Sequence, residues 1–196
     1  MNIRTAATAA LALSAALVLA GCSTGTEDDS MPGMDHGSSE QAADVNDADV
    51  TFASMMIVHH EQAIEMSDIV LAKDGLDPEV MELAEAIKTA QAPEMEQLQG
   101  WLDDWGVDPD EHEMDGMDHG DGMMSEEDLA ALEAAGGAEA SRLFLEQMIV
   151  HHEGAVAMAQ TQVDEGSNPD AVEFARTIID AQTAEIQEME DLLASL

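Results

Sequence analysis

The residues best suited to chemistry are two His-His-Glu triplets, His59-His60-Glu61 and His151-His152-Glu153, which hold four of the seven histidines. Imidazole is a common ligand of copper and zinc. It is also a frequent hydrogen-bonding group in protein cores, and for a single histidine on an apolar helix face that is the ordinary explanation. Two identical pairs instead favour metal binding in the bundle, at one site or two and through either histidine of each pair, with a duplicated polar core network as the alternative.

The triplets belong to two copies of a longer stretch, Phe52–Met66 and Phe144–Met158, which are identical at nine of fifteen positions. Such self-similarity is an internal duplication. In each copy one methionine precedes the histidines by about one helical turn and another follows by about two turns, so all can converge from one helix surface. Imidazole and thioether without thiolate suit Cu(I), whereas imidazole with carboxylate could take Cu(II) or zinc. The expected bundle ligands are Met56, His59, His60, Met66, Met148, His151, His152 and Met158.

A second group of soft ligands lies in polar, aperiodic segments. The phrase Met-Asp-His-Gly occurs at residues 34–37 and again at residues 117–120, in a chain with 15 methionines. Packing does not explain a thioether in a polar segment, and flexible Met/His clusters suit Cu(I) or Ag(I). Drift in a low-complexity linker is the alternative. The candidate ligands here are Met31, Met34, His36, His112, Met114, Met117, His119, Met123 and Met124.

The N-terminus has the pattern of an export signal. Residues 1–21 combine Arg4 with an apolar run and a small-residue exit, which is typical of a secretory signal peptide. The ending Leu19-Ala20-Gly21-Cys22 resembles the bacterial lipobox, and this resemblance implies cleavage before Cys22 and lipidation of that residue. We therefore expect an exported protein, anchored by lipid to the outer face of the bacterial cytoplasmic membrane. An ordinary secretion signal is the alternative.

Composition limits the fold and the partners. With 43 acidic and 5 basic residues, the formal charge of −38 argues against nucleic acid and against electrostatic docking to anionic membranes. Helix-forming residues dominate, aromatic residues make up 3% and tyrosine is absent, which favours an all-α fold. Cys22 is the only cysteine, so neither an intramolecular disulfide nor a thiolate metal site is expected.

The chain divides into a flexible tether over residues 22–47 and a duplicated helical region over residues 48–196. Repeat one covers 48–106, a Met/His-rich linker covers 107–124, and repeat two covers 125–196. In repeat one we expect a helix over about 48–73, with Asp47 as N-cap, and a second from Pro78 to Trp105. Pro93 lies inside the second helix and should kink or break it.

Repeat two begins with a short helix after Ser125, followed by helices over about 138–163 and from Pro169 almost to Leu196. Residues 84–95 match residues 175–186, so each repeat is a helical hairpin and two hairpins make a four-helix bundle. These matching stretches supply natural partners for buried imidazoles, which we expect to lie behind the ligands. They are Gln91, Glu94, Gln182 and Glu185.

The repeated motif Phe-x3-Met-Ile-x-His-His-Glu-x-Ala-x2-Met, followed by Ala-x2-Ile-x3-Gln-x2-Glu, resembles the domain of unknown function 305 family over residues 48–196. The resemblance implies a ferritin-like four-helix bundle. Exported members include copper-binding proteins of the CopM type, so it also implies extracytoplasmic binding of Cu(I) or Ag(I) for metal buffering, transfer or resistance. The chain departs from the pattern at Pro93, so copy one is expected to be less regular than copy two.

Two other functions compete with copper binding. A structural or interaction module would use the paired histidines only as core groups. A ferritin-like di-metal oxidase would need Glu-x-x-His pairs, whereas here each glutamate follows its histidines. The chain shows no nucleophile arrangement and no phosphate-binding glycine loop, so neither catalysis nor an organic cofactor is expected. The expected partners are metal ions and, through Cys22, a membrane; a protein that receives the copper is not identified by the sequence.

Overall fold

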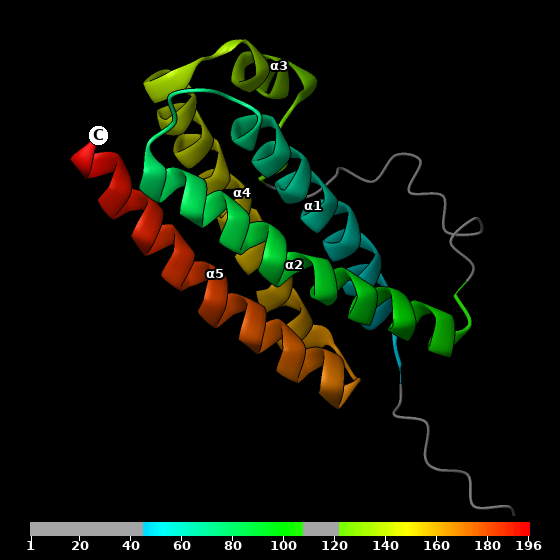
Figure 1. The fold of residues 1–196 in the computed structure, drawn as a ribbon. Helices are drawn as coiled ribbons and strands as arrows, with labels where there is room; N and C mark the ends of the chain where they lie inside the picture. The colour runs from blue at the N-terminus through cyan, green and yellow to red at the C-terminus, as the bar shows by residue number, and fades with distance from the viewer. Residues whose placement is uncertain (1–44, 108–121) are drawn as a thin grey trace, which may run out of the picture. The chain divides into compact units, whose positions relative to one another are not determined.

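The computed structural model describes residues 45–107 and 122–196, which belong to one compact unit, Ser39–Leu196. Within these ranges every regular element is a helix, as predicted (Figure 1). The expected signal peptide, the lipidation site Cys22, the tether up to residue 44 and linker residues 108–121 lie outside the described residues. The helices are α1 (Asp47–Leu71), α2 (Pro78–Trp105), α3 (Glu126–Ala134), α4 (Gly137–Glu165) and α5 (Pro169–Ser195).

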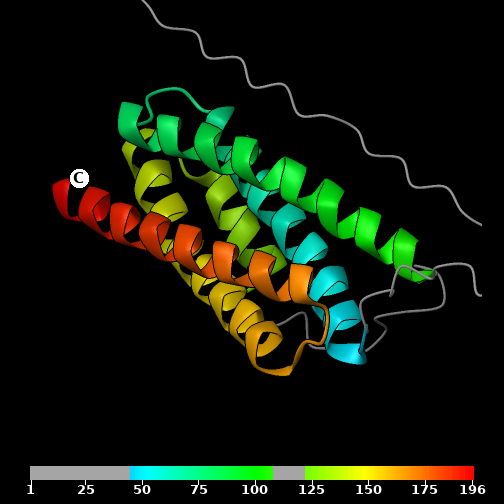
Figure 2. The ribbon, with the colours of Figure 1, turned by 90° about the horizontal axis from the view of Figure 1, so that it is seen from below.

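The four long helices form a bundle of two hairpins. Helix α1 packs against α2, α4 packs against α5, and the hairpins meet where α1 packs against α4. Neighbouring helices run antiparallel (Figures 1 and 2). The short helix α3 lies against α1 and α4 at one end of the bundle. The predicted four-helix bundle of duplicated hairpins is therefore confirmed. None of the described helices is long and apolar enough to cross a membrane.

Most helix ends lie where the sequence predicts them, with one correction at α1. Asn46, not Asp47, is the N-cap: its side chain accepts from the Asp49 amide while the Asp49 carboxylate accepts from the Asn46 amide. This reciprocal capping box satisfies two amides that an Asp47 cap would leave to solvent. At α2, Asp77 and Gly106 cap the two ends, as predicted.

Helix α2 continues through Pro93 without a break, so the expected break is wrong. Proline has no N–H to donate to the carbonyl four residues earlier, which belongs to Thr89. Both residues are exposed, so this carbonyl can accept hydrogen bonds from water instead. The fold therefore tolerates the proline on the outer face of α2.

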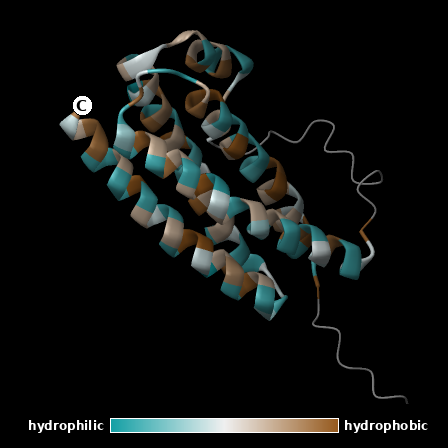
Figure 3. Ribbon diagram, viewed as in Figure 1, coloured by the Kyte–Doolittle hydropathy of each residue, from teal (hydrophilic) through white to brown (hydrophobic). Residues whose placement is uncertain are grey.

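The core consists of two apolar clusters with the histidines between them. One cluster, near α3, contains Met66, Phe144 and Met148, and the other, toward the opposite end, contains Phe52 and Met56. Along α1 and α4 the His-His pairs stand where one cluster gives way to the other. Figure 3 shows the corresponding hydrophobic stripes on the inner sides of the helices and polar outer faces. The paired histidines are thus a polar layer inside an apolar core.

A buried carboxylate ties the start of α1 to the turn between α4 and α5. Asp49 is fully buried and accepts hydrogen bonds from the Gln162 side chain at 2.5 Å, from the Asn168 amide at 3.1 Å and from the Ser167 amide at 3.2 Å. The Asn46 side chain adds a bond of 2.9 Å to the Glu165 carbonyl. These contacts hold the two repeats together at the end of the bundle farther from α3.

The end of the Met/His-rich linker is anchored rather than free. Gly122–Ser125, which we call the strap, crosses α1 and α4. The Gln62 side chain bonds both the amide and the carbonyl of Met124, at 2.7 and 2.9 Å. Gly122 lies so near α4 that a Cβ on it would stand 2.8 Å from the Cα of Gly154. Met124 packs against the core, which corrects its expected place in a flexible segment.

Replacement of Asp49 tests the buried junction. Asp49→Ala leaves the Ser167 and Asn168 amides and the Gln162 side chain without their acceptor, so the free energy of unfolding should fall by about 3 kcal/mol. Urea denaturation followed by circular dichroism measures the change. The control is Asp47→Ala, an exposed acid in the same helical turn, which should cost less than about 1 kcal/mol. Equal effects of the two substitutions would contradict the structural role of Asp49.

Candidate metal centre

The centre of the polar layer is a pair of stacked histidines. His59 of α1 and His151 of α4 place their ring centroids 3.7 Å apart, with the ring planes tilted by 40°. The two side chains come from opposite repeats because α1 and α4 pack antiparallel at equivalent positions of the duplicated motif. His59 is 1% exposed and His151 is fully buried. Neither ring nitrogen of either residue has a hydrogen-bond partner among the described residues.

Burial keeps these two imidazoles neutral. Desolvation, reinforced by repulsion from His60 and His152, lowers the pKa of His59 from 6.5 to about 3. Desolvation, reinforced by repulsion from the neighbouring histidines, also lowers the pKa of His151 well below its usual value, although a contact with the backbone of His59 opposes this shift. A neutral imidazole keeps an unprotonated nitrogen, which is the form that binds metal. At neutral pH protons therefore do not compete for this pair.

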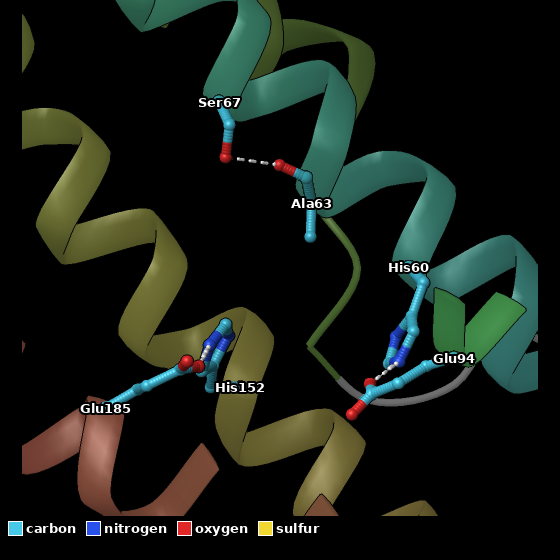
Figure 4. A network of polar contacts seen from close by, with 6 residues as sticks. All are labelled: His60, Ala63, Ser67, Glu94, His152 and Glu185. Atoms are coloured by element: carbon cyan, nitrogen blue, oxygen red, sulfur yellow. Dashed lines mark hydrogen bonds and ion pairs between the residues drawn. The ribbon is translucent and has the colours of Figure 1, made fainter. Parts of the chain in front are cut away.

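The other two histidines are each held by a carboxylate from the second helix of their own hairpin (Figure 4). His60 Nε2 lies 2.7 Å from Glu94 Oε2, and His152 Nε2 lies 2.7 Å from Glu185 Oε2. Both rings are fully buried, whereas the glutamate side chains are 21% and 23% exposed. The two contacts have the same length, so copy one is not less regular than copy two here, contrary to expectation.

The carboxylates determine which ring nitrogen is free. A carboxylate accepts hydrogen bonds, so Nε2 of His60 and of His152 is the donor in these contacts, and in the neutral tautomer Nδ1 then carries the lone pair. Nδ1 of both residues is buried and has no partner among the described residues. A histidine that donates one N–H to a carboxylate and offers the other nitrogen is the usual form of a metal-bound imidazole. The layer thus offers four histidines with an unpartnered nitrogen.

Gln91 and Gln182, one helical turn before the glutamates, are also buried, each 3% exposed. Their Oε1 atoms have no hydrogen-bond partner among the described residues. The expected pairing of glutamates with imidazoles is present in the geometry, while the glutamines make no described contact with the rings. Their roles behind a metal remain predictions.

The methionines predicted as bundle ligands divide into buried and half-buried ones. Met56, Met66 and Met148 are fully buried in the two apolar clusters that flank the histidine layer. Met158 is half-buried at the edge of the cluster farther from α3. Glu61 and Glu153, the glutamates of the two triplets, are exposed.

The other predicted ligands lie apart from this layer. Met123 and Met124 are described and half-buried in the strap. Within residues 45–107 and 122–196, no group of three or more His, Cys, Asp or Glu side chains stands ready to hold a metal ion. The predicted ligands outside the described residues are Met31, Met34, His36, His112, Met114, Met117 and His119.

Sequence reasoning did not single out Asp49 or Met55. Asp49 lies outside the duplicated motif and its partners lie more than 110 positions away, so its role depends on the tertiary fold. Met55 stands one helical turn before His59 on α1, half-buried beside Met158 of α4. Its spacing from His59 was a signal that could have drawn attention to it.

Comparison with known proteins agrees with this architecture. The family profile described as "Domain of unknown function (DUF305)" matches residues 49–193. The chain belongs to the DUF305 family. A DUF305 crystal structure from Streptomyces coelicolor is 37% identical, with a TM-score of 0.68 over 76% of this chain and 93% of that one. A DUF305 fragment from Deinococcus radiodurans is 32% identical, with a TM-score of 0.66 over 78% and 99%.

Similarity extends to CopM, whose structures include metal-bound forms. The Cu(I)-bound form of CopM is 31% identical to this DUF305 chain, with a TM-score of 0.62 over 75% of this chain and 96% of that one. CopM is also known in Cu(II)-bound and Ag-bound forms. No protein with a curated function matches the chain.

The neutral histidine pair predicts an acid sensitivity of the metal-free protein. Below pH 6.5 the unfolded chain binds a proton at His59, whereas the folded chain binds this proton only near pH 3. The free energy of unfolding therefore decreases as the pH is lowered across that window. His59 alone should cost about 2 kcal/mol between pH 7 and pH 5, and His151, whose pKa is also lowered, should add to this loss. Urea denaturation at both pH values measures this loss.

The control for this prediction is the double variant His59→Gln, His151→Gln, which lacks both titrating imidazoles. Its stability should depend less steeply on pH than that of the parent, since the carboxylates common to both proteins titrate alike. The same pH dependence in both proteins would show that the stacked histidines are not neutral in the fold.

Proposed function

We propose that this protein is an extracytoplasmic copper-binding protein, not an enzyme, and that it holds Cu(I), or Ag(I) in its place, in the histidine layer. It would serve metal buffering, transfer or resistance. The observation that carries the proposal is the set of buried imidazole nitrogens without partners: both of His59, both of His151, and Nδ1 of His60 and of His152. Buried polar atoms in native proteins are normally satisfied, and leaving one unpaired costs about 1–3 kcal/mol. Coordination of a metal would satisfy several of them at once.

A monovalent ion suits this layer better than a divalent one. The interior offers neutral imidazoles and thioethers, and the two nearby carboxylates already accept from His60 and His152. Desolvation of an ion grows with the square of its charge, so a divalent ion loses far more hydration energy in a neutral core. Soft, neutral ligands also favour Cu(I) over zinc. The Cu(I)- and Ag-bound forms of CopM support this choice.

Binding requires a local rearrangement of the rings. The lone pair of an imidazole nitrogen lies in the ring plane, so two rings stacked with centroids 3.7 Å apart do not direct their nitrogens at a common ion. Rotation about the side-chain torsions of His59 and His151 would direct their nitrogens toward it. Met56 and Met148, each one turn before a histidine pair, are the nearest thioethers along the same helices and would complete the coordination.

Export and anchoring form a separate part of the proposal. The signal-like residues 1–21 and the lipobox-like end at Cys22 support secretion followed by lipid attachment to the outer face of the cytoplasmic membrane. The Met/His-rich segments would then collect metal outside the cytoplasm, and the bundle would hold it. A receiving protein is a further partner expected of a transfer function.

The alternative with a specific observation behind it is a structural module with a polar core. The His60–Glu94 and His152–Glu185 pairs are the contacts that such a core would use. The stacked pair argues against it, because a core network is expected to satisfy its own members, and the ring nitrogens of His59 and His151 have no hydrogen-bond partner within residues 45–107 and 122–196.

Replacement of the histidines separates the bundle site from the linkers. In an anaerobic Cu(I) competition titration on residues 23–196, changing His59, His60, His151 and His152 to Ala should remove tight binding and leave only weaker binding by the Met/His-rich segments. The matched control changes His36, His112 and His119 to Ala and should keep the tight site. Circular dichroism shows whether each variant is folded. Unchanged tight affinity in the first variant would move the site to the linkers.

The glutamates behind the outer histidines should tune the affinity. Glu94→Gln with Glu185→Gln removes the charged acceptors that orient His60 and His152, so Cu(I) affinity should fall by about 10- to 100-fold. The control is Glu61→Gln with Glu153→Gln, which removes the same charge from exposed positions beside the same histidines. An equal loss in both variants would mean that the glutamates act only through the overall charge.

A further inference from the structure

A second candidate binding site is an open groove between the first turns of α1 and the last turns of α4. Its volume is about 390 Å³, and its lining includes the half-buried thioethers of Met55 and Met158, the side chain of Gln162, and the carboxylates of Asp47 and Glu165. Phe52 and the apolar cluster around it form the floor. The site is separate from the histidine layer, although it lies on the same two helices.

The duplication supplies a comparison for this groove, because the equivalent surface of the other repeat is closed by α3. Gln147 occupies the position equivalent to Met55, and its side chain donates to the Asp128 carbonyl of α3 at 2.9 Å. Lys73 is equivalent to Glu165 and donates to the Glu133 carbonyl of α3 at 2.8 Å. Leu132 of α3 is fully buried over this surface. No described element covers the groove at Met55 and Met158 in this way.

The open groove also differs in its residues. Thr51 and Thr161 stand where the closed surface has Leu143 and Ile69, so the groove is polar enough to face water. Two thioethers nevertheless remain partly exposed among these hydroxyls and the acidic rim. Met66, which is equivalent to Met158 on the closed surface, is by contrast fully buried. Paired thioethers facing a negatively rimmed groove suit a soft cation.

Gln162 places an unpartnered acceptor at the groove, a state that its Oε1 shares with that of Gln147 on the closed surface. Its side chain is 1% exposed, and its Nε2 donates to the buried carboxylate of Asp49 at 2.5 Å. This bond fixes the amide, and Oε1 is left without a hydrogen-bond partner among the described residues. A buried carbonyl oxygen in that state costs free energy unless something binds it. Gln162 lines the groove, so the missing partner can be supplied there.

We propose that this groove binds one soft monovalent cation, Cu(I) or Ag(I), through Met55 Sδ and Met158 Sδ with Gln162 Oε1 as an additional ligand. The cation would pass from this outer site to the histidine layer, a step that rests on the proposed function. Met55 lies one turn before His59, about 6 Å along α1, and Met158 lies two turns beyond His151, about 10 Å along α4. The thioethers bind the cation weakly in the groove and the imidazoles bind it more tightly in the histidine layer. This difference in affinity gives the transfer its direction.

Ag(I) titration of residues 23–196, which retain the whole compact unit, tests the outer site directly. With methionine methyl groups labelled by carbon-13, NMR reports each thioether separately, and the histidine ring signals report the inner layer. The Met55 and Met158 methyl signals should shift together, with one common dissociation constant, as one Ag(I) binds to the groove after the tighter histidine site is filled. Met55→Leu with Met158→Leu should remove one Ag(I) from the stoichiometry. The control, Met81→Leu with Met95→Leu on α2, should not.

Cu(I) transfer from a chromophoric chelator tests the passage inward. The Met55→Leu, Met158→Leu variant should load the histidine layer about tenfold more slowly, because the cation is no longer concentrated beside it, with less than about a twofold change in final affinity. Equal rates in this variant and the α2 control would overturn the transfer step.

The outcomes of the Ag(I) titration separate this site from the proposed function. If the histidine signals shift and the Met55 and Met158 methyl signals do not, the outer site is overturned and the histidine site stands. If both methyl signals shift and the histidine signals do not, the groove is a metal site and the proposed histidine site fails. If neither set responds, both proposals are overturned.

Discussion

The stack of His59 on His151 is the contact on which the centre of the bundle depends. It lies where α1 meets α4, the helix pair that joins the two repeats, and it interrupts an otherwise apolar core. Two neutral imidazoles without hydrogen bonds are a poor choice for stability alone, since leucine or methionine would fill the same space at no polar cost. Their presence is most simply explained by a ligand that the apolar residues could not bind.

The surrounding residues keep this layer in order. Each repeat contributes one stacked histidine and one histidine held by a glutamate at 2.7 Å, so the layer has the same construction on both sides of the α1–α4 contact. The outer pairs connect the interior to partly exposed carboxylates on α2 and α5. The apolar clusters on either side exclude water from the rings of His59 and His151, which keeps these two imidazoles neutral. Because of the duplication, one chain supplies both halves of the histidine layer, and these halves face each other across the α1–α4 contact.

Much of this arrangement could be predicted from the sequence, because it depends on local spacing. The repeated motif predicted the hairpins and the facing histidine pairs, and Glu94 and Glu185 were recognised as partners for buried imidazoles. Which histidine of each pair contacts its counterpart in the other repeat, and which contacts a glutamate, could not be predicted. Adjacent residues on a helix point about 100° apart, and only the packing of α1 on α4 and of the second helices decides which ring meets its counterpart and which meets a glutamate.

Other differences also arose from contacts distant in the sequence. Asn46 caps α1 through a capping box with Asp49, and the distant Glu165 carbonyl and Ser167 hydroxyl also hold its side chain. Pro93 was expected to interrupt α2, but its position on the exposed face makes the lost hydrogen bond tolerable. In both cases local rules identified the right kind of residue, and the surroundings in the folded chain decided the outcome.

The strap has a consequence for how the two halves can evolve. Among the described residues it crosses the bundle once, and the repeats differ where it passes: copy one has Gln62, which bonds Met124, and copy two has Gly154, which lets the Gly122 backbone approach α4. Recombination that made the copies alike would either lose the glutamine's anchor or fill the space that the strap needs. An ancestral pair of identical hairpins therefore had to diverge at this position before the strap could cross α1 and α4.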